Sequence, residues 1–278
     1  MKIAIVTGAS SGIGQAAARR LASSGFQVLA GVRKAADAAA WERVPSATPL
    51  LIDVTLEDSV NAALKKCRSR LEKATEVHLV NNAGIAVAGP VEGVSLDKWK
   101  EQFEVNVFGL IRATQAFLPF IRATKGRVVN ISSVSGLATS PYLGPYSASK
   151  FAVEAISDAL RREIAQFGCR VVVVEPGPID TPIWNKGLSK KDFLLSDLSD
   201  ELQKVYGHDL ATLHKAVEKS ARDAVPVGLV ADVVEKALLA RRPRTRYIVG
   251  TRALHAQMAA ARFAPDRLLD ALVAMEFR

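Results

Sequence analysis

Short apolar runs rich in valine and isoleucine alternate along the chain with longer stretches whose apolar positions recur every three or four residues. The short runs indicate buried strands and the longer period indicates helices; their alternation is typical of a parallel sheet covered on both faces. The predicted strands are residues 2–7, 27–32, 49–52, 77–81, 127–131, 170–175 and 246–249. The predicted helices are residues 12–24, 55–72, 95–122, 146–167 and 230–240. We therefore expect a doubly wound α/β fold with a seven-stranded parallel sheet, which binds its ligand beyond the carboxyl ends of the strands.

Neither an internal repeat nor a low-complexity tract divides the 278 residues, so one domain over residues 1–278 is expected. A polar helical stretch at about residues 185–222 precedes the last predicted strand. An insertion at this place predicts a helical lid over a substrate pocket, with a surface excursion as the alternative. A helical extension is expected at about residues 253–278, where it would cap the pocket, contact a partner subunit or rest on a membrane.

Composition indicates a globular protein without a membrane span. Hydrophobic residues make up 49% and charged residues 23%, and no apolar run reaches the roughly 18 residues that a span needs. The apolar N-terminal run ends at Thr7, too early for a secretion signal, so we expect a cytoplasmic protein. Cys67 and Cys169 are isolated and are expected to be reduced packing residues. No spacing of histidine, cysteine and carboxylate residues predicts a metal site.

The net charge of +9 raises the question of a nucleic-acid partner. Residues 241–278 alone carry eight arginines against three carboxylates, and the remaining excess is scattered without an aromatic-interleaved basic stripe. A cofactor with several phosphates, or an anionic membrane surface, explains this balance equally well. We expect no nucleic-acid partner and at most a peripheral contact with a membrane.

A glycine-rich turn lies between the first predicted strand and the first predicted helix. Gly8, Gly12 and Gly14 allow a tight turn, so that backbone N–H groups can approach a pyrophosphate at the positive end of the helix dipole. The strand before and the helix after the glycines are the context that such a motif requires. The turn predicts that the protein binds a dinucleotide.

The end of the second predicted strand indicates which dinucleotide is preferred. An acidic residue there would bind the ribose 2′-hydroxyl of NAD, but this chain has Val32 followed by Arg33 and Lys34. A cation pairs with a 2′-phosphate, whereas a carboxylate repels it. NADP(H) is therefore predicted over NAD(H), with a solvated basic pair as the alternative reading.

Tyr146 and Lys150 stand four residues apart at the start of a predicted helix, so their side chains share one face. Holding a tyrosine poised near neutrality means lowering its pKa from about 10 by about 3 units, or roughly 4 kcal/mol. An ammonium about 4 Å away supplies roughly 1 to 4 kcal/mol. The pair is therefore a candidate for proton transfer, in which Lys150 lowers the pKa of Tyr146. Taken alone, the spacing also occurs by chance on any amphipathic helix.

Several further motifs follow the glycine turn along the chain. They are Asp53-Val54, Asn81-Asn82-Ala83-Gly84, Asn106, Ser133 at 13 positions before Tyr146, and Pro176-Gly177-Pro178-Ile179-Asp180-Thr181. Together with the glycine turn and the Tyr146–Lys150 pair, they resemble the short-chain dehydrogenase/reductase family over nearly the whole chain. The segments 117–133 and 150–155 and the turn at 244–247 are similar to its retinol dehydrogenase and 17β-hydroxysteroid dehydrogenase branch.

The resemblance implies a Rossmann-type fold and a set of site residues. The implied catalytic residues are Asn106, Ser133, Tyr146 and Lys150, with Tyr146 as the acid–base group and Asn106 supporting a water chain to Lys150. The implied cofactor-binding residues are Gly8, Ser10, Ser11, Gly12, Ile13, Gly14, Arg33, Lys34, Asp53, Val54, Asn82, Ala83, Gly84, Tyr146, Lys150, Pro176, Gly177, Ile179 and Thr181. The expected substrate contacts are Ser133, Leu137, Tyr142, Leu143, Tyr146 and Trp184, with Ala86, Val87 and Ile183 as further apolar lining.

These residues predict an oxidoreductase that interconverts a hydrophobic alcohol, such as a steroid or retinoid, and its ketone or aldehyde by hydride transfer. Two alternatives stay open: a reductase of acyl or polyketide intermediates, and a catalytically silent protein that senses the dinucleotide. The resemblance also implies a homodimer or homotetramer. Branch members in animals often carry a membrane-anchoring N-terminal helix, and no such helix is predicted here.

Overall fold

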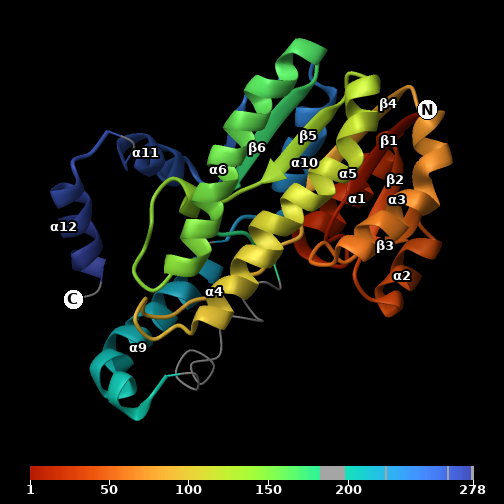
Figure 1. Ribbon diagram of the computed structural model, residues 1–278. Helices are drawn as coiled ribbons and strands as arrows, with labels where there is room; N and C mark the ends of the chain where they lie inside the picture. Colours follow the sequence, from red (N-terminus) through yellow and green to blue (C-terminus); the bar gives the residue numbers. More distant parts are fainter. Residues whose placement is uncertain (182–197, 223, 262, 277–278) are drawn as a thin grey trace.

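In a computed structural model, which describes residues 1–181, 198–222, 224–261 and 263–276, seven strands form one parallel sheet. Its strand order is β3-β2-β1-β4-β5-β6-β7 (Figure 1). The strands are β1 Lys2–Val6, β2 Gln27–Val32, β3 Ala47–Leu51, β4 Glu76–Asn81, β5 Arg127–Ile131, β6 Arg170–Pro176 and β7 Arg246–Val249. The described part of the chain thus confirms the predicted seven-stranded, doubly wound sheet.

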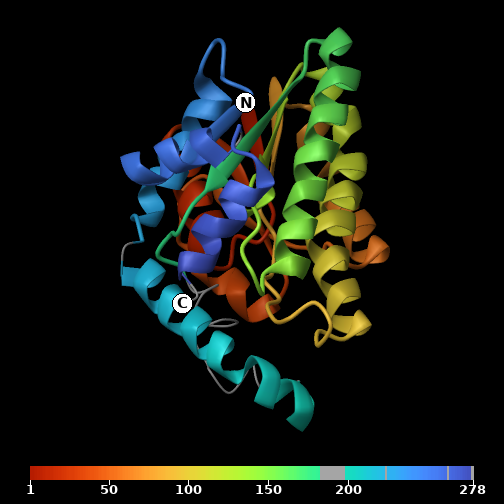
Figure 2. The ribbon, with the colours of Figure 1, turned by 90° about the vertical axis from the view of Figure 1, so that its left-hand side faces the viewer.

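Helices cover both faces of the sheet, as Figure 2 shows with α5 and α6 on one side and α10 on the other. The helices of the first half are α1 Gly12–Ser23, α2 Ala35–Glu42, α3 Glu57–Glu72, α4 Leu96–Phe103 and α5 Gly109–Ala123. Those of the second half are α6 Gly144–Ile164, α9 Asp200–Arg222, α10 Val227–Leu239, α11 Arg252–Ala261 and α12 Asp266–Glu276.

Successive side chains along each strand point to opposite faces of the sheet, and this divides the core into two layers. In β1, Ala4 and Val6 pack toward α1 and α10, whereas Ile3 and Ile5 pack toward α3, α5 and α6. All four side chains are almost completely buried, because both faces of a parallel sheet are covered. This rigid core fixes where the carboxyl ends of the strands lie.

The strand order reverses between β1 and β4, since β1 is followed in the chain by β2 on one side and pairs with β4 on the other. A crevice opens at such a reversal, beyond the carboxyl ends of the strands. Two backbone contacts fix the chain there: the Thr7 N–H donates to Val80 O at 3.0 Å, and the Ala9 N–H donates to Gly31 O at 2.7 Å. The turn that precedes α1 is thereby tied to β2 and β4.

Helical segments differ from the sequence prediction at several places; α10, for example, begins at Val227 rather than at the predicted residue 230. Residues 35–42 form α2, which was not predicted because its run of alanines has no clear period. The predicted helix over 95–122 is divided by a π-helical turn, Glu104–Phe108, between α4 and α5. α6 begins at Gly144, two residues before the predicted start, because Pro145 fits the first turn of a helix.

The region expected to form a lid is described only from residue 198 onward, and there it forms α9. α9 lies beyond the carboxyl end of β6 (Figure 2). Its Asp209 accepts a hydrogen bond from the Tyr142 hydroxyl at 2.6 Å, and its Tyr206 bonds Glu92. α9 therefore contacts two loops at this end of the sheet. None of the described helices is long and apolar enough to cross a membrane.

Candidate active site

A cleft of about 630 Å³ runs along the carboxyl ends of the strands, and the glycine turn forms one wall of it. Gly8 and Gly12 have φ values of +66° and +55°, which a residue with a Cβ adopts only at a cost. α1 begins directly after this turn, with no side-chain cap from Ser11 and no acidic residue in its first turn. The N–H groups at this helix end therefore lack a side-chain cap, at the place where the sequence predicts an anionic group.

Gly14 brings α1 close to the loop that follows β4. A Cβ at Gly14 would lie 2.3 Å from the Nδ2 atom of Asn82 and 2.3 Å from the carbonyl oxygen of Gly8. Asn82 Nδ2 donates to the carbonyl oxygens of Thr7 and Gly8, each at 3.1 Å. The hydroxyl of Thr7 accepts the N–H groups of Asn82 and Ala83. This packing holds an open backbone surface in place, and its donors suit the pyrophosphate of a dinucleotide.

The end of the cleft beside β2 carries the predicted basic pair. Arg33 and Lys34 both line the cleft and are exposed. Asp53, also in the lining, accepts hydrogen bonds from the N–H and hydroxyl of Thr55 through Oδ1. Asp37 of α2 lines the same end and was missed by the sequence prediction, which placed no helix there. Two cations and two carboxylates thus line the end of the cleft at which the sequence predicts a 2′-phosphate.

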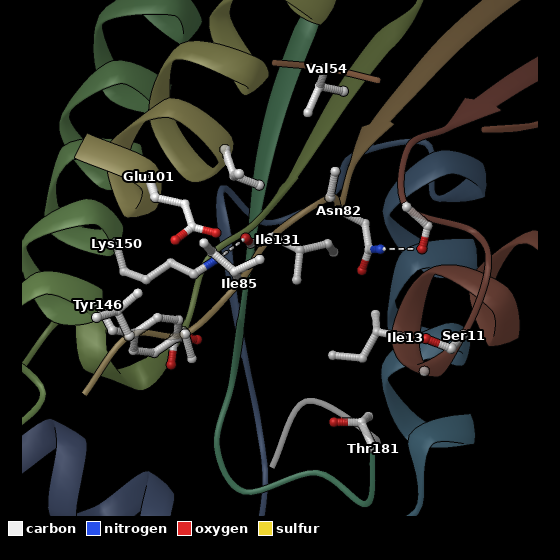
Figure 3. A pocket seen from close by; sticks show the side chains of 18 of the residues that line it. Ser11, Ile13, Val54, Asn82, Ile85, Glu101, Ile131, Tyr146, Lys150 and Thr181 are labelled. Atoms are coloured by element: carbon white, nitrogen blue, oxygen red, sulfur yellow. Dashed lines mark hydrogen bonds between the residues drawn. The ribbon is translucent and has the colours of Figure 1, made fainter. Parts of the chain in front are cut away.

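Ser133, Tyr146 and Lys150 meet in the middle of the cleft. All three line it, and Figure 3 shows the Tyr146 and Lys150 side chains extending side by side from α6. The Nζ atom of Lys150 lies 5.7 Å from the centre of the Tyr146 ring and donates a hydrogen bond to the carbonyl oxygen of Ile131 at 2.9 Å. The i, i+4 spacing thus places both groups on one helix face, as predicted.

Burial dominates the protonation of this pair. It raises the pKa of the Tyr146 hydroxyl above its ordinary value, and a hydrogen bond with Ser133 lowers it only in part. Burial also lowers the pKa of Lys150 to about 8, while the Glu154 carboxylate raises it. The expected lowering of the Tyr146 pKa by Lys150 is not what these side chains produce. The factors that shift this pKa are the burial of the phenol and its hydrogen bond with Ser133, whereas the Lys150 ammonium hydrogen-bonds the Ile131 carbonyl.

Asn106 lies buried in the π-helical turn, away from the lining of the cleft. Its side-chain oxygen accepts the N–H of Ile85 at 2.9 Å, and its Nδ2 donates to Ile85 O and to the hydroxyl of Ser149, each at 3.1 Å. Asn106 therefore ties the loop after β4 to α6, the helix that carries Tyr146 and Lys150.

The predicted cofactor residues gather around the cleft. Those that line it are Gly8, Ser10, Ser11, Gly12, Ile13, Arg33, Lys34, Asp53, Val54, Asn82, Ala83, Gly84, Tyr146, Lys150, Pro176, Gly177, Ile179 and Thr181. Gly14 is buried behind the turn and acts through its close packing.

The structure brings only part of the predicted substrate contacts together: Ser133, Tyr146, Ala86 and Val87 line the cleft. Leu137, Tyr142 and Leu143 do not line the cleft, and Ile183 and Trp184 lie outside the described residues. Tyr142 sits at a backbone φ of +66°, and its hydroxyl bonds Asp209. The walls on this side come from the loop after β4, which includes the predicted Ala86 and Val87, from α4 and from the residues just before α9. They are Ile85, Ala86, Val87, Ala88, Val94, Lys98, Glu101 and Leu198.

In the part of the chain that the structure describes, no three His, Cys, Asp or Glu side chains gather closely enough to hold a metal ion.

Comparison with known proteins adds to this geometry. A family model described as short chain dehydrogenase matches residues 2–192. The chain is 40% identical to the NADPH-dependent 3-dehydrocapnine reductase of Ornithobacterium rhinotracheale, over 97% of this chain and 95% of that protein. It is 36% identical to retinol dehydrogenase 5 of Homo sapiens, over 96% of this chain and 86% of that protein. A crystal structure of a short chain dehydrogenase from Burkholderia cenocepacia in complex with NADP matches with a TM-score of 0.73 and 25% identity, over 98% and 99% of the two chains.

Proposed function

The chain belongs to the short-chain dehydrogenase family of oxidoreductases, which use a nicotinamide dinucleotide, and we propose that it interconverts a hydrophobic alcohol and its ketone or aldehyde with NADP(H). The observation that carries this proposal is the meeting of Ser133, Tyr146 and Lys150 in the same cleft as the glycine turn. A reacting carbon held there lies within reach of both a proton donor and the dinucleotide site.

In the reduction direction, Tyr146 donates its phenolic proton to the carbonyl oxygen as that oxygen gains negative charge. When bound, the dinucleotide supplies the hydride to the carbonyl carbon, or accepts it in the reverse reaction. The Ser133 hydroxyl donates a hydrogen bond to the same oxygen and stabilises its developing charge. Lys150 holds a positive charge beside the phenol, and its hydrogen bond to Ile131 fixes the position of the ammonium.

The raised pKa of Tyr146 favours reduction at neutral pH, because the phenol then stays protonated and ready to donate. Oxidation needs the phenolate, so its rate is expected to rise with pH. Asn106 supports this arrangement as a positioning residue, since it binds both Ile85 and Ser149 beside the site.

The cofactor preference rests on charge at the end of β2. Arg33 and Lys34 line the cleft there, and Val32 takes the place of an acidic residue that would select NAD. A charge-assisted hydrogen bond to a 2′-phosphate is roughly twice as strong as a neutral one. Two cations at the end of the cleft beside β2 therefore favour NADPH. The name of the relative from Ornithobacterium, an NADPH-dependent reductase, supports the same preference.

The substrate class follows from the walls beside Tyr146. Ile85, Ala86, Val87, Val94 and Leu198 give that part of the cleft an apolar surface. Such walls favour a hydrophobic carbonyl compound over a sugar or a phosphate ester. The names of the relatives, a retinol dehydrogenase and a 3-dehydrocapnine reductase, support an alcohol or carbonyl substrate.

The test is a screen of NADPH and NADH oxidation at 340 nm against retinal, ketosteroids and short aliphatic ketones. Steady oxidation of NADPH with at least one apolar carbonyl, and slower oxidation of NADH, is the expected result. Tight NADPH binding without turnover of any carbonyl would instead support the dinucleotide-sensing alternative.

A further inference from the structure

A cluster of charged side chains lies behind the cleft, where α6, β6 and β7 meet. Arg246 of β7 binds three carboxylates: its Nε lies 3.0 Å from Glu154 and 3.3 Å from Glu175, and its Nη2 lies 3.0 Å from Asp158. Glu154 is 8% exposed and Glu175 only 1% exposed. Buried carboxylates are tolerated only when they are paired, so the Arg246 guanidinium compensates the charge of these carboxylates.

The cluster adjoins the active site through α6. Glu154 follows Lys150 by four residues, which puts the two side chains on one face of the helix, one turn apart. Lys150 is 7% exposed, and no carboxylate of the described residues lies within ion-pair distance of its Nζ. Its direct partner is the neutral Ile131 carbonyl. Glu154 is therefore the nearest compensating charge along the helix.

Only part of the charge of Glu154 is neutralised by contact. Its Oε2 atom accepts from Arg246, while its buried Oε1 atom has no hydrogen-bond partner within the described residues. In surroundings from which water is excluded, such a charge acts on a cation one turn away. Burial lowers the pKa of Lys150 and the Glu154 carboxylate raises it. Together the two effects leave this pKa at about 8.

The other charged groups around the pair do not substitute for Glu154. Glu101 of α4, which lines the same cleft, pairs with Lys98 at 3.0 Å. Asp158, one turn further along α6, is shared between Arg246 and Arg161. Glu175 of β6 also contacts Arg246. Tyr146, on the far side of Lys150, is a neutral phenol whose pKa is raised.

We propose that Glu154 is a positioning residue of the active site, which keeps Lys150 cationic from behind while Arg246 anchors the carboxylate from the last strand. This inference rests on the proposed function, because it assumes that a charged Lys150 serves the reaction. In this arrangement the Arg246 cation, the Glu154 carboxylate and the Lys150 ammonium follow one another from β7 toward the proton donor Tyr146.

The test compares Glu154→Gln with Asp158→Asn, a matched control that also removes a carboxylate from Arg246 but lies two turns from Lys150. Glutamine keeps the shape and still accepts a hydrogen bond from Arg246, so E154Q is expected to fold, which circular dichroism checks. Glu154→Asp, which keeps the charge, is expected to behave like the wild type.

The first readout is the pKa of Lys150, followed by NMR of protein labelled at the lysine side chains and assigned with Lys150→Met. E154Q is expected to lower this pKa by about one unit, a roughly ten-fold change in the ratio of charged to neutral lysine, and D158N by clearly less. The second readout is the pH profile of NADPH-dependent reduction, whose alkaline limb is expected to move down by the same amount.

A Lys150 pKa that stays in place in E154Q overturns this inference and leaves the proposed function intact. Wild-type turnover in Lys150→Met would instead contradict the proposed function, because that function assigns Lys150 a role in the reaction.

Discussion

Gly14 offers a quantitative test of the dinucleotide site, because a single methyl group there meets backbone. In Gly14→Ala the new Cβ would lie 2.3 Å from both Asn82 Nδ2 and Gly8 O, where ordinary contact begins at 3.4 Å. The start of α1 must therefore move away from the turn by about 1 Å. No other route relieves the overlap, since one of the two contacts is a backbone carbonyl.

The expected cost follows from these contacts. Overpacking costs about 1 to 3 kcal/mol, and loosening the two hydrogen bonds of Asn82 adds about 1 kcal/mol each. The helix preference for alanine returns at most about 1 kcal/mol. A net loss of about 2 to 4 kcal/mol is expected, which lowers the melting temperature by roughly 4 to 16 °C at about 2 to 4 °C per kcal/mol. NADPH affinity should fall at least about ten-fold, because the N–H groups at the helix end move with α1.

The assays are thermal unfolding and an NADPH titration followed by fluorescence. Gly228→Ala is the matched control: Gly228 lies in α10 and its added Cβ meets no neighbouring group within 4 Å, so the variant should bind NADPH as the wild type does and melt at the same or a slightly higher temperature. The reasoning is refuted if G14A melts and binds NADPH as G228A does.

Three further changes have defined outcomes. Arg33→Ala should raise the KM for NADPH about ten-fold or more and leave that for NADH nearly unchanged, whereas Lys100→Ala should alter neither; equal loss for both cofactors would contradict the role of charge. Tyr142→Phe removes the 2.6 Å hydrogen bond to Asp209, so limited proteolysis should cut within α9 several-fold faster, and an unchanged cutting rate would show that this bond does not hold the helix. Burial lowers the pKa of His78 to about 4, so its contribution to stability, up to about 3 kcal/mol, should be lost as the pH falls from about 6.5 toward 4; urea unfolding of His78→Gln should show a flatter pH dependence over that window, and an equally steep one would exclude His78 as the cause.

The sheet could be predicted from the sequence because each strand is a short run that must be buried on both faces. The β-branched residues within 127–131 and 170–175 supply apolar side chains to both faces of their segments, and both segments are strands. α2 was not predictable in this way, since alanine packs equally well on any face and gives no period. The π-helical turn at 104–108 also leaves no hydrophobic signature, because it shifts the helix by one residue without changing which residue types are buried.

At the site, the residues fixed by backbone geometry were the predictable ones. Tyr146 and Lys150 share a helix face by spacing alone, and the glycine turn requires φ values that only its glycines adopt readily. The substrate wall was predicted only at Ala86 and Val87; Tyr142 bonds Asp209 and does not line the cleft, and this contact joins distant parts of the chain. The same holds for Arg246, which the sequence presents only as an arginine in a strand.

The most direct test of the central claim is a comparison of Tyr146→Phe with the wild type, measuring both kcat for carbonyl reduction and the Kd for NADPH. Because phenylalanine keeps the ring and removes only the proton donor, kcat should fall by about 10² to 10⁴, and the Kd should stay within about three-fold. Retention of kcat in that variant would contradict the account, since no other described side chain is assigned to protonate the carbonyl oxygen.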